Sequence, residues 1–257
     1  VCSSDLRRFI WCGHGIFAFS VLCFLYALWV EPYWMQVNQF EILTPKLKNA
    51  SFRIVQISDL HCDQKVRLED ELAEKINAFK PDVVVFTGDA LNEGSKKNME
   101  VFRNALAGIV APLGKFAIKG NWNYGSHRLF EEAGFEPISG RKMDITKDGE
   151  SIRITGWDYE YGNAQLMRRN DPGKFNVFLY HTPDIVEDVP AADVDLYLCG
   201  HTHGGQVSLP FYGAIVTLSK FGKKYEAGMY EVNGFKMYVN RGRSEEHTSE
   251  LQSPNTI

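Results

Sequence analysis

Apolar runs and amphipathic segments alternate through the middle of the chain, and this alternation predicts strands followed by helices. The run at 83–86 is Val-Val-Val-Phe, which has no polar residue and predicts a strand buried on both faces. The segment at 52–58 predicts a neighbouring strand. Apolar residues recur at helical spacing over 68–79, ending at Pro81, and again over 99–109, so we expect an amphipathic helix at each place.

The second half of the chain is richer in expected strands than in expected helices. Strands are expected at 116–118, 152–155, 175–180, 195–198, 225–232 and 235–240. The Asn-Gly pair at 233–234 is a typical two-residue hairpin turn, and the Thr-Pro pair at 182–183 predicts the start of a helix. Strand–helix alternation followed by β-rich sequence predicts an α/β fold in which two packed sheets form a β-sandwich flanked by helices.

An uncharged apolar run at 9–30 precedes this domain. As a helix it would span roughly 33 Å at about 1.5 Å per residue, enough to cross a bilayer. We therefore expect one transmembrane anchor at 7–34, followed by a linker and entry strand at 35–51. A cleaved signal peptide is the alternative. Arg7 and Arg8 come just before the run, which places the N-terminus in the cytoplasm and the domain outside.

Residues 1–6 and 243–257 resemble the translation of a sequencing-library adapter, and the alternative for the second is a disordered polar tail. With both ends excluded, the globular domain is expected at 52–242 and is expected to be truncated at its C-terminus. The whole chain has 257 residues, 44% of them hydrophobic, and a net charge of −4. Because the first end carries −1 and the second −2, the remaining chain is at −1, which gives no reason to expect a nucleic-acid partner.

Five short polar signatures each follow an apolar, strand-like run. They are Asp59-Leu60-His61, Gly88-Asp89, Gly120-Asn121, His181 and Gly200-His201-Thr202-His203. Together they supply two Asp, one Asn and four His, a nitrogen and oxygen ligand set that suits Mn, Fe or Zn. Because open α/β sheets build their sites at the carboxyl ends of strands, we expect these side chains to meet in one place.

The order Asp-x-His, Gly-Asp, Gly-Asn, His, Gly-His-x-His is similar to that of the calcineurin-like metallophosphoesterases. The string Gly-His-Thr-His-Gly-Gly-Gln at 200–206, followed by Leu-Pro at 209–210, resembles membrane-anchored bacterial members that include UDP-2,3-diacylglucosamine hydrolases. The resemblance covers most of 52–242. It implies a four-layer fold, two divalent metal ions with Mn favoured, and a place in the bacterial inner membrane.

The resemblance also implies a role for each signature residue. Asp59, His61 and His203 would hold the first metal. Asn121, His181 and His201 would hold the second, and Asp89 would bridge the two. A water activated by both metals would attack the phosphorus, with Asp89, Asn121 and His201 contributing to catalysis through it. The implied substrate is a phosphodiester or pyrophosphate, with UDP-2,3-diacylglucosamine of lipid A synthesis as the single best candidate. That nucleotide lipid would be met on the cytoplasmic face, whereas the arginine pair places the domain outside.

One departure from the family pattern concerns the residues after Asn121. The family usually continues Gly-Asn-His-Asp or Glu, and this chain has Trp122 and Asn123 instead. The absent His normally helps to protonate the leaving group. We assign Trp122 to substrate binding, with His127 as a weaker candidate that is otherwise a helix-surface histidine. The alternatives for the whole protein are a non-catalytic metal-binding module and a broad-specificity phosphodiesterase of the cell envelope.

Overall fold

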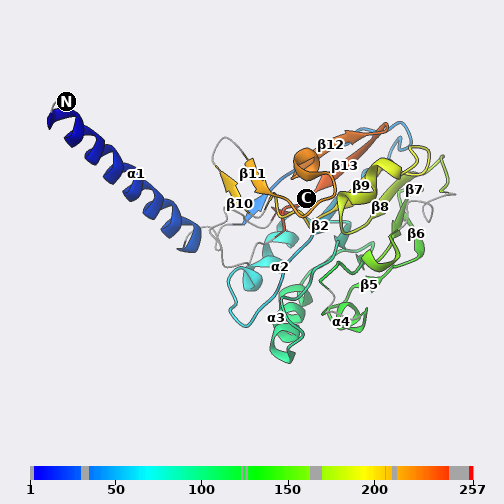
Figure 1. Ribbon diagram of the computed structural model, residues 1–257. Coiled ribbons are helices and arrows are strands. Elements are labelled where there is room, and N and C mark those ends of the chain that lie inside the picture. Colours follow the sequence, from blue (N-terminus) through cyan, green and yellow to red (C-terminus); the bar gives the residue numbers. More distant parts are fainter. Residues whose placement is uncertain are drawn as a thin grey trace.

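Two β-sheets lie face to face in the computed structural model, as Figure 1 shows. The structure describes residues 3–29, 35–122, 124, 127–162, 170–205, 207–209, 213–242 and 255–256. The first sheet has four parallel strands in the order β2-β3-β4-β5. Its strands are β2 (Ile54–Ile57), β3 (Val83–Phe86), β4 (Lys115–Ala117) and β5 (Glu136–Pro137). Hydrophobic β-branched residues dominate β2 and β3, as expected for strands buried on both faces.

The second sheet has six strands in the order β12-β13-β9-β8-β7-β6. Its strands are β6 (Arg141–Lys147), β7 (Glu150–Gly156), β8 (Phe175–Leu179), β9 (Leu196–Cys199), β12 (Gly228–Val232) and β13 (Phe235–Val239). The strands from β7 through β8 and β9 to β13 are parallel, and the hairpins β6–β7 and β12–β13 are antiparallel at the two edges. The parallel centre therefore collects several carboxyl ends at one edge of the sheet.

Alternate side chains of each strand face different hydrophobic layers. In β3, Val83 and Val85 pack between the two sheets, with Ile154 and Val177 of the second sheet. The other side chains of β3 face the helices: Phe86 contacts Phe102 edge-on at a ring-centroid distance of 5.3 Å. Because successive side chains of a strand point to opposite faces, β3 packs against the second sheet on one face and against the helices on the other.

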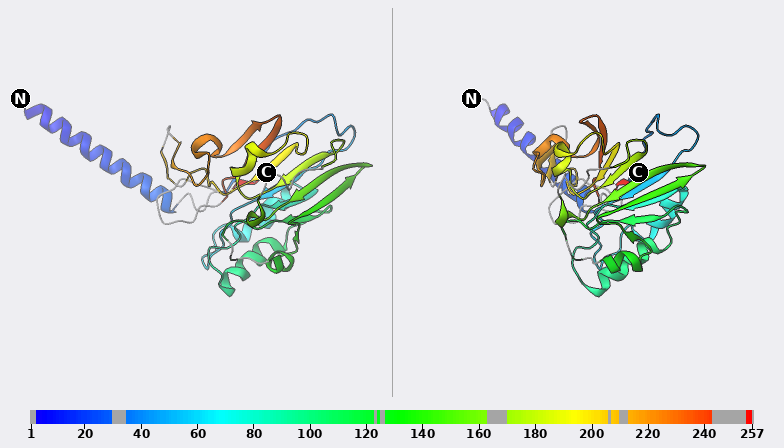
Figure 2. Two further views of the ribbon diagram at one scale, coloured as in Figure 1. Left: turned by 45° about the vertical axis from the view of Figure 1, so that its right-hand side comes forward. Right: turned by 90° about the vertical axis from the view of Figure 1, so that its right-hand side faces the viewer.

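Helices cover the outer face of the first sheet, as the two views of Figure 2 show. Short 3-10 helices border the second sheet. The helices are α2 (Glu69–Ala78), α3 (Lys96–Ala107) and α4 (His127–Glu132), and the 3-10 helices are η2 (Tyr159–Tyr161), η4 (Pro183–Asp188) and η5 (Gly222–Tyr225). The Ser95 side chain caps α3 by accepting the Asn98 backbone N–H at 3.1 Å. The order helix, sheet, sheet, 3-10 helix confirms the expected α/β sandwich with flanking helices.

An isolated helix, α1 (Ser3–Trp29), extends away from the domain (Figure 1). Its stretch Arg7–Tyr26 is long and apolar enough to cross a membrane, a property that a signal sequence near the N-terminus would share. Apolar side chains such as Phe9 and Trp11 are exposed along it. Two small sheets complete the elements: β10 (Val207–Leu209) with β11 (Gly213–Val216), and β1 (Gln36–Val37) with β14 (Asn255–Thr256).

Two local features differ from what the sequence predicts, and a third agrees with it. The helix expected after the Thr-Pro pair at 182–183 is the six-residue 3-10 helix η4, although Thr182 does cap it by accepting the Asp184 N–H at 3.3 Å. The strand β6 was not expected from the sequence. The hairpin turn at Asn233 and Gly234 is present, with φ angles of 49° and 88° that fit a type I′ turn.

Candidate metal centre

The carboxyl ends of strands from both sheets carry the predicted ligands. In the first sheet, Asp59 and His61 follow β2, Asp89 follows β3, and Asn121 follows β4. In the second sheet, His181 follows β8, and His201 and His203 follow β9. Because the strands within each sheet are parallel here, their ends lie along one edge, and the facing of the sheets brings the two edges together.

Backbone hydrogen bonds tie the ligand-bearing loops to one another. The Asp59 N–H donates to the Gly88 carbonyl at 2.9 Å, and the His61 N–H donates to the Asp89 carbonyl at 3.1 Å. In the second sheet, the Gly200 N–H donates to the His181 carbonyl at 2.8 Å. These bonds continue the strand pairing beyond the strands and fix the relative positions of the loops.

The side chains gather into two groups, each able to hold one cation. The first group is Asp59, His61 and His203, and the second is Asp89, His181 and His201. Within each group the ligand atoms all lie within 4.8 Å of one another. The structure therefore contains two candidate metal sites with carboxylate and imidazole donors.

The two groups meet at the carboxylate of Asp89. Its Oδ2 lies 3.6 Å from Nε2 of His61 in the first group and 3.1 Å from Nε2 of His181 in its own group. Asp59 makes a second link, because its Oδ1 lies 3.6 Å from Nε2 of His203 and 3.9 Å from Nε2 of His181. This position of Asp89 suits a ligand shared by two cations.

Unsatisfied buried nitrogens indicate that the groups suit a metal. Both ring nitrogens of His61 and Nδ1 of His203 are buried without a hydrogen-bond partner. Buried polar atoms are ordinarily paired, because an unpaired one costs on the order of 1–3 kcal/mol. A cation bound by these atoms would remove that cost and would offset the two neighbouring carboxylates, so the donor set fits a pair of divalent ions.

Burial and neighbouring charges shift the pKa values of these groups. Burial, reinforced by His203, lowers the pKa of His61 to about 4, and burial also lowers the pKa of His203 to about 4. Burial and the neighbouring His181 lower the pKa of His201 to about 3. These three imidazoles are therefore neutral at pH 7, which is the form that binds metals.

Asp89 and His181 favour each other's charged form. For Asp89 the effect of burial is outweighed by the charge and hydrogen bond of His181, so its pKa is held below the usual range. For His181 the effect of burial is outweighed by Asp89 and then Asp59, so its pKa is raised. Burial raises the pKa of Asp59 to about 6. A buried positive charge is thus favoured between these two carboxylates.

Hydrogen bonds from outside the two groups orient the ligands. The Ser58 hydroxyl donates to Oδ2 of Asp59, and the His201 backbone N–H lies 3.1 Å from both oxygens of that carboxylate. Nδ1 of His181 is 2.8 Å from the Thr87 carbonyl, which leaves Nε2 facing the carboxylates. Such supporting contacts fix the tautomer and direction of metal ligands.

Five of the predicted ligands adopt the left-handed backbone conformation. Their φ angles are 51° at Asp59, 41° at His61, 57° at Asp89, 73° at His201 and 52° at His203. Residues other than glycine rarely adopt such angles, although Asp and His do so more often than most. The sharp turns aim the side chains toward the shared edge at a conformational cost on the order of 1–3 kcal/mol per residue.

Asn121 and Trp122 lie at the rim of the centre. Both are exposed, and the backbone N–H of Trp122 donates to Oδ1 of Asp89 at 2.9 Å. The ring of Trp122 is 6.0 Å from that of His61, measured between centroids. Asn123 lies outside the described residues. The metal-binding role of Asn121 and the substrate-binding role of Trp122 remain predictions.

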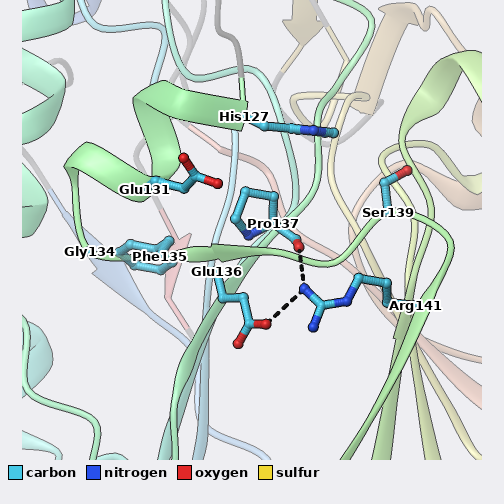
Figure 3. A pocket seen from close by; sticks show the side chains of 8 residues that line it. All are labelled: His127, Glu131, Gly134, Phe135, Glu136, Pro137, Ser139 and Arg141. Carbon is cyan, nitrogen blue, oxygen red and sulfur yellow. Dashed lines mark hydrogen bonds and ion pairs between the residues drawn. The ribbon is translucent and has the colours of Figure 1, made fainter.

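His127 lies at the start of α4 and belongs to a different neighbourhood. Its Nε2 is 2.7 Å from Oδ2 of Asp158, a carboxylate that is fully buried. Figure 3 shows His127 at one end of a cavity of about 580 Å³, with the ion pair of Glu136 and Arg141 at the other. The lining of this cavity includes none of the seven predicted ligands. His127 thus has a fixed partner, and its role in substrate binding remains a prediction.

One residue near the centre was missed from the sequence. Arg241 is exposed and follows β13, and a β-carbon placed on Gly204 would lie 3.1 Å from its Cδ and Nε. Its neighbour Gly242 packs on Asp59, since a β-carbon there would lie 2.2 Å from Cβ of Asp59. The signal was present, because Asn-Arg-Gly at 240–242 follows a strand as the five signatures do.

Comparison with known proteins gives a consistent result. A family model described as calcineurin-like phosphoesterase matches residues 52–205. The chain is 34% identical to the uncharacterized metallophosphoesterase YkuE of Bacillus subtilis (strain 168), across 84% of this chain and 81% of that protein.

Two further relatives carry more specific names. The chain is 35% identical to the UDP-2,3-diacylglucosamine pyrophosphatase LpxG of Chlamydia trachomatis serovar D, across 76% of this chain and 77% of that protein. It is 26% identical to the phosphodiesterase YaeI of Escherichia coli (strain K12), across 85% of each.

Proposed function

Because this chain belongs to the calcineurin-like phosphoesterase family, we propose that it hydrolyses a phosphodiester or pyrophosphate bond with the help of two divalent cations. The observation that carries the proposal is the meeting of two ligand groups at one edge of the two sheets, with buried imidazole nitrogens that lack a partner. Such a pair of sites is what in-line displacement at phosphorus uses.

In this proposal each ligand group holds one cation and Asp89 serves both. Asp59, His61 and His203 form the first set, and His181 and His201 form the second. We propose Asn121 as a further ligand of the second set. The mixed carboxylate and imidazole donors suit Mn, Fe or Zn, and we favour Mn. Two bound divalent ions supply Lewis acidity and neutralise charge that develops on the phosphoryl oxygens.

The side chains around the centre favour a leaving group that needs little protonation. The residue after Asn121 is Trp122, whose indole N–H is too weak an acid to protonate a leaving group and donates to the Asn92 carbonyl at 2.7 Å. A phosphate ester or nucleotide leaves more readily than an alkoxide, so diesters of acidic alcohols and pyrophosphates fit better than alkyl monoesters. His127 remains the weaker candidate for substrate binding. The exposed Arg241 is a candidate contact for the phosphate oxygens.

UDP-2,3-diacylglucosamine is the single substrate that we propose first. A relative of this chain is named as a pyrophosphatase of that molecule, and another is named as a phosphodiesterase. We further propose that α1 anchors the domain to a membrane, where a lipid-linked substrate is met, since its apolar side chains are exposed. A broad-specificity phosphodiesterase of the cell envelope is the second candidate, favoured by the external domain that Arg7 and Arg8 predict.

The test is an activity panel on protein loaded with Mn²⁺. The panel contains a phosphate monoester, a chromogenic phosphodiester and UDP-2,3-diacylglucosamine. We expect cleavage of the last two, and we expect Asp89→Asn to lower kcat/KM by more than the roughly 10- to 100-fold typical of residues that only support a metal ligand. Asp144→Asn, an exposed Asp on β6, is the matched control and should retain activity.

Two results would contradict this function, and a third would change only the substrate. Stoichiometric metal binding without turnover of any phosphate compound would instead support a non-catalytic metal-binding module. Activity that survives Asp89→Asn would contradict the proposed centre. Preference for soluble diesters over the nucleotide lipid would keep the hydrolase activity and would favour the broad-specificity phosphodiesterase as its form.

A further inference from the structure

Two half-exposed aromatic residues, Trp122 and Tyr124, lie beside each other at the rim of the metal centre. Trp122 is 38% exposed and Tyr124 is 48% exposed. Their ring centroids are 6.0 Å apart, and the rings are inclined at 63°. A single exposed apolar side chain is ordinary, but a pair of open aromatic rings next to a buried polar site calls for an explanation.

Trp122 is held in place at both its backbone and its ring. Its backbone N–H donates to Oδ1 of Asp89 at 2.9 Å, and its indole N–H donates to the Asn92 carbonyl at 2.7 Å. The ring lies edge-to-face with His61, at an angle of 76° and a centroid distance of 6.0 Å. The indole is therefore fixed against a predicted metal ligand, so that its position follows that of the centre.

Tyr124 extends this surface away from the centre. Its backbone N–H donates to the Trp122 carbonyl at 3.0 Å, which closes a tight turn between the two residues. A β-carbon on Gly94 would lie 3.5 Å from Cδ1 of Tyr124, an ordinary contact distance, so the ring rests on the loop that follows Asp89. The two rings thus share one support, the loop that carries Asn92 and Gly94.

Taking the phosphoesterase function proposed above as given, we propose that Trp122 and Tyr124 stack the base of a nucleotide, so that the substrate is a nucleoside diphosphate ester or another nucleotide phosphodiester. Every base has a flat π-face, and fixed aromatic side chains bind such faces without reading their hydrogen-bond edges. The phosphate end of the same nucleotide would lie at the ligand groups, one ribose away from the rings.

An acyl chain is the other occupant that an exposed aromatic pair could contact. A flexible chain loses rotational freedom at each bond that it orders on the surface, whereas a rigid base loses little. Because Trp122 is held by one hydrogen bond from its backbone and one from its ring, the ring offers a fixed face, which favours a flat partner. Contact with an acyl chain is therefore treated as an outcome of the test.

The test compares two monophosphates that differ only in the base. UMP and ribose 5-phosphate are titrated calorimetrically into Mn²⁺-loaded protein, which needs no turnover. We expect UMP to bind about 5- to 150-fold more tightly than ribose 5-phosphate, the range that stacking of one base gives. In Trp122→Leu this ratio should fall to near one while the affinity for ribose 5-phosphate stays the same.

Further variants separate stacking from a general loss of structure. Trp122→Phe should recover part of the ratio because it restores a flat ring, and Tyr124→Leu should lower it. Tyr161→Leu is the matched control, since Tyr161 is an exposed tyrosine of η2 and should leave the ratio unchanged. Thermal melting and metal content of each variant report whether it is folded and loaded.

The source of the base is distinguished by comparing UDP-N-acetylglucosamine with UDP-2,3-diacylglucosamine. A loss of kcat/KM on both UDP-sugars in Trp122→Leu supports base stacking. Whichever UDP-sugar the wild-type protein cleaves with the higher kcat/KM shows whether the natural nucleotide is soluble or lipid-linked. The inference is overturned if wild-type protein binds UMP no better than ribose 5-phosphate, or if Trp122→Leu keeps the ratio. It is also overturned if Trp122→Leu weakens a dialkyl phosphate as much as UMP, which would assign the rings to an acyl chain.

The inference and the proposed function can fail separately. Base-selective binding without hydrolysis of any ester would remove the proposed function and keep the stacking site. Hydrolysis without base selectivity would keep the function and remove the stacking site.

Discussion

Gly120 packs directly against the carboxylate of Asp89, so that a β-carbon at position 120 would lie 2.0 Å from Oδ1 of that side chain. Even alanine at 120 must therefore displace the carboxylate at which the two ligand groups meet. We expect Gly120→Ala to lower kcat/KM and metal affinity by at least about 10- to 100-fold, the range for disturbing support of a metal ligand. Metal content of the dialysed protein and steady-state kinetics would measure the two effects.

The control for this prediction is Gly108→Ala. Gly108 is at the end of α3, and its β-carbon would meet only Cβ of Ala73, at 3.3 Å. The control should keep its metal and activity. Wild-type metal content in Gly120→Ala would show that the Asp89 carboxylate has room to move and would contradict the prediction.

Ser58 should tune the first metal site without binding metal itself. Its hydroxyl donates to Oδ2 of Asp59, so Ser58→Ala removes a bond that orients this ligand. We expect roughly 10- to 100-fold weaker binding at one site only. Competition titration with a chelating dye should resolve one weakened and one unchanged site. Ser151→Ala, which removes a hydroxyl between β6 and β7, is the control.

Arg241 should contribute to substrate binding more than to the chemical step. A charged hydrogen bond to phosphate contributes on the order of 1.5–3 kcal/mol, so Arg241→Gln should raise KM by about 10-fold or more with a smaller change in kcat. Lys236→Gln, at the other end of β13, is the control. Unchanged KM in Arg241→Gln would exclude a phosphate contact.

Asp144 should make the free energy of unfolding depend on pH. Hydrogen bonds from Arg153, and from Lys174, hold the pKa of Asp144 below its usual range. A lowered carboxylate pKa in the folded state stabilises the protein above the ordinary value of 3.8, and that stabilisation is lost as the pH falls through the folded-state pKa. Because the side chain is 41% exposed, we expect Asp144→Asn to lower the free energy of unfolding at pH 7 by only about 0.5–1 kcal/mol.

Urea unfolding of metal-free protein at pH 7 and below pH 3 would measure this difference. It should shrink in acid. Asp148→Asn, in the turn of the same hairpin where φ is 50° and Asn is tolerated, should match wild type at both pH values. A difference that grows in acid would contradict the assignment to Asp144.

The buried strands were the part of the fold that the sequence predicted best. The run at 83–86 is β3 from end to end, because a strand covered on both faces has no polar residue to hide its limits. The strand β6 was missed for the opposite reason. It lies at the edge of its sheet, where charges such as Arg141 and Asp144 are tolerated and mask the alternation.

The grouping of ligands followed from the residue types and their places after strands, but their spatial arrangement did not. Which imidazole approaches which carboxylate depends on how the two sheets face each other, and no local pattern encodes that. The direction of the Trp122 ring depends on a carbonyl of Asn92, in a loop some distance away in sequence. Arg241 was overlooked because Asn-Arg-Gly after a strand is a weak signal until the neighbours of Arg241 in space are known.

The left-handed backbone lowers the stability of the protein at five positions that its proposed activity needs: Asp59, His61, Asp89, His201 and His203. Glycine would adopt these φ angles without the penalty of a β-carbon, so replacing any of the five removes backbone strain while deleting a predicted metal ligand. A library selected only for heat resistance in a chelating medium would therefore accumulate glycine at these positions and lose catalysis first. Variants for industrial use would need selection for turnover at every round.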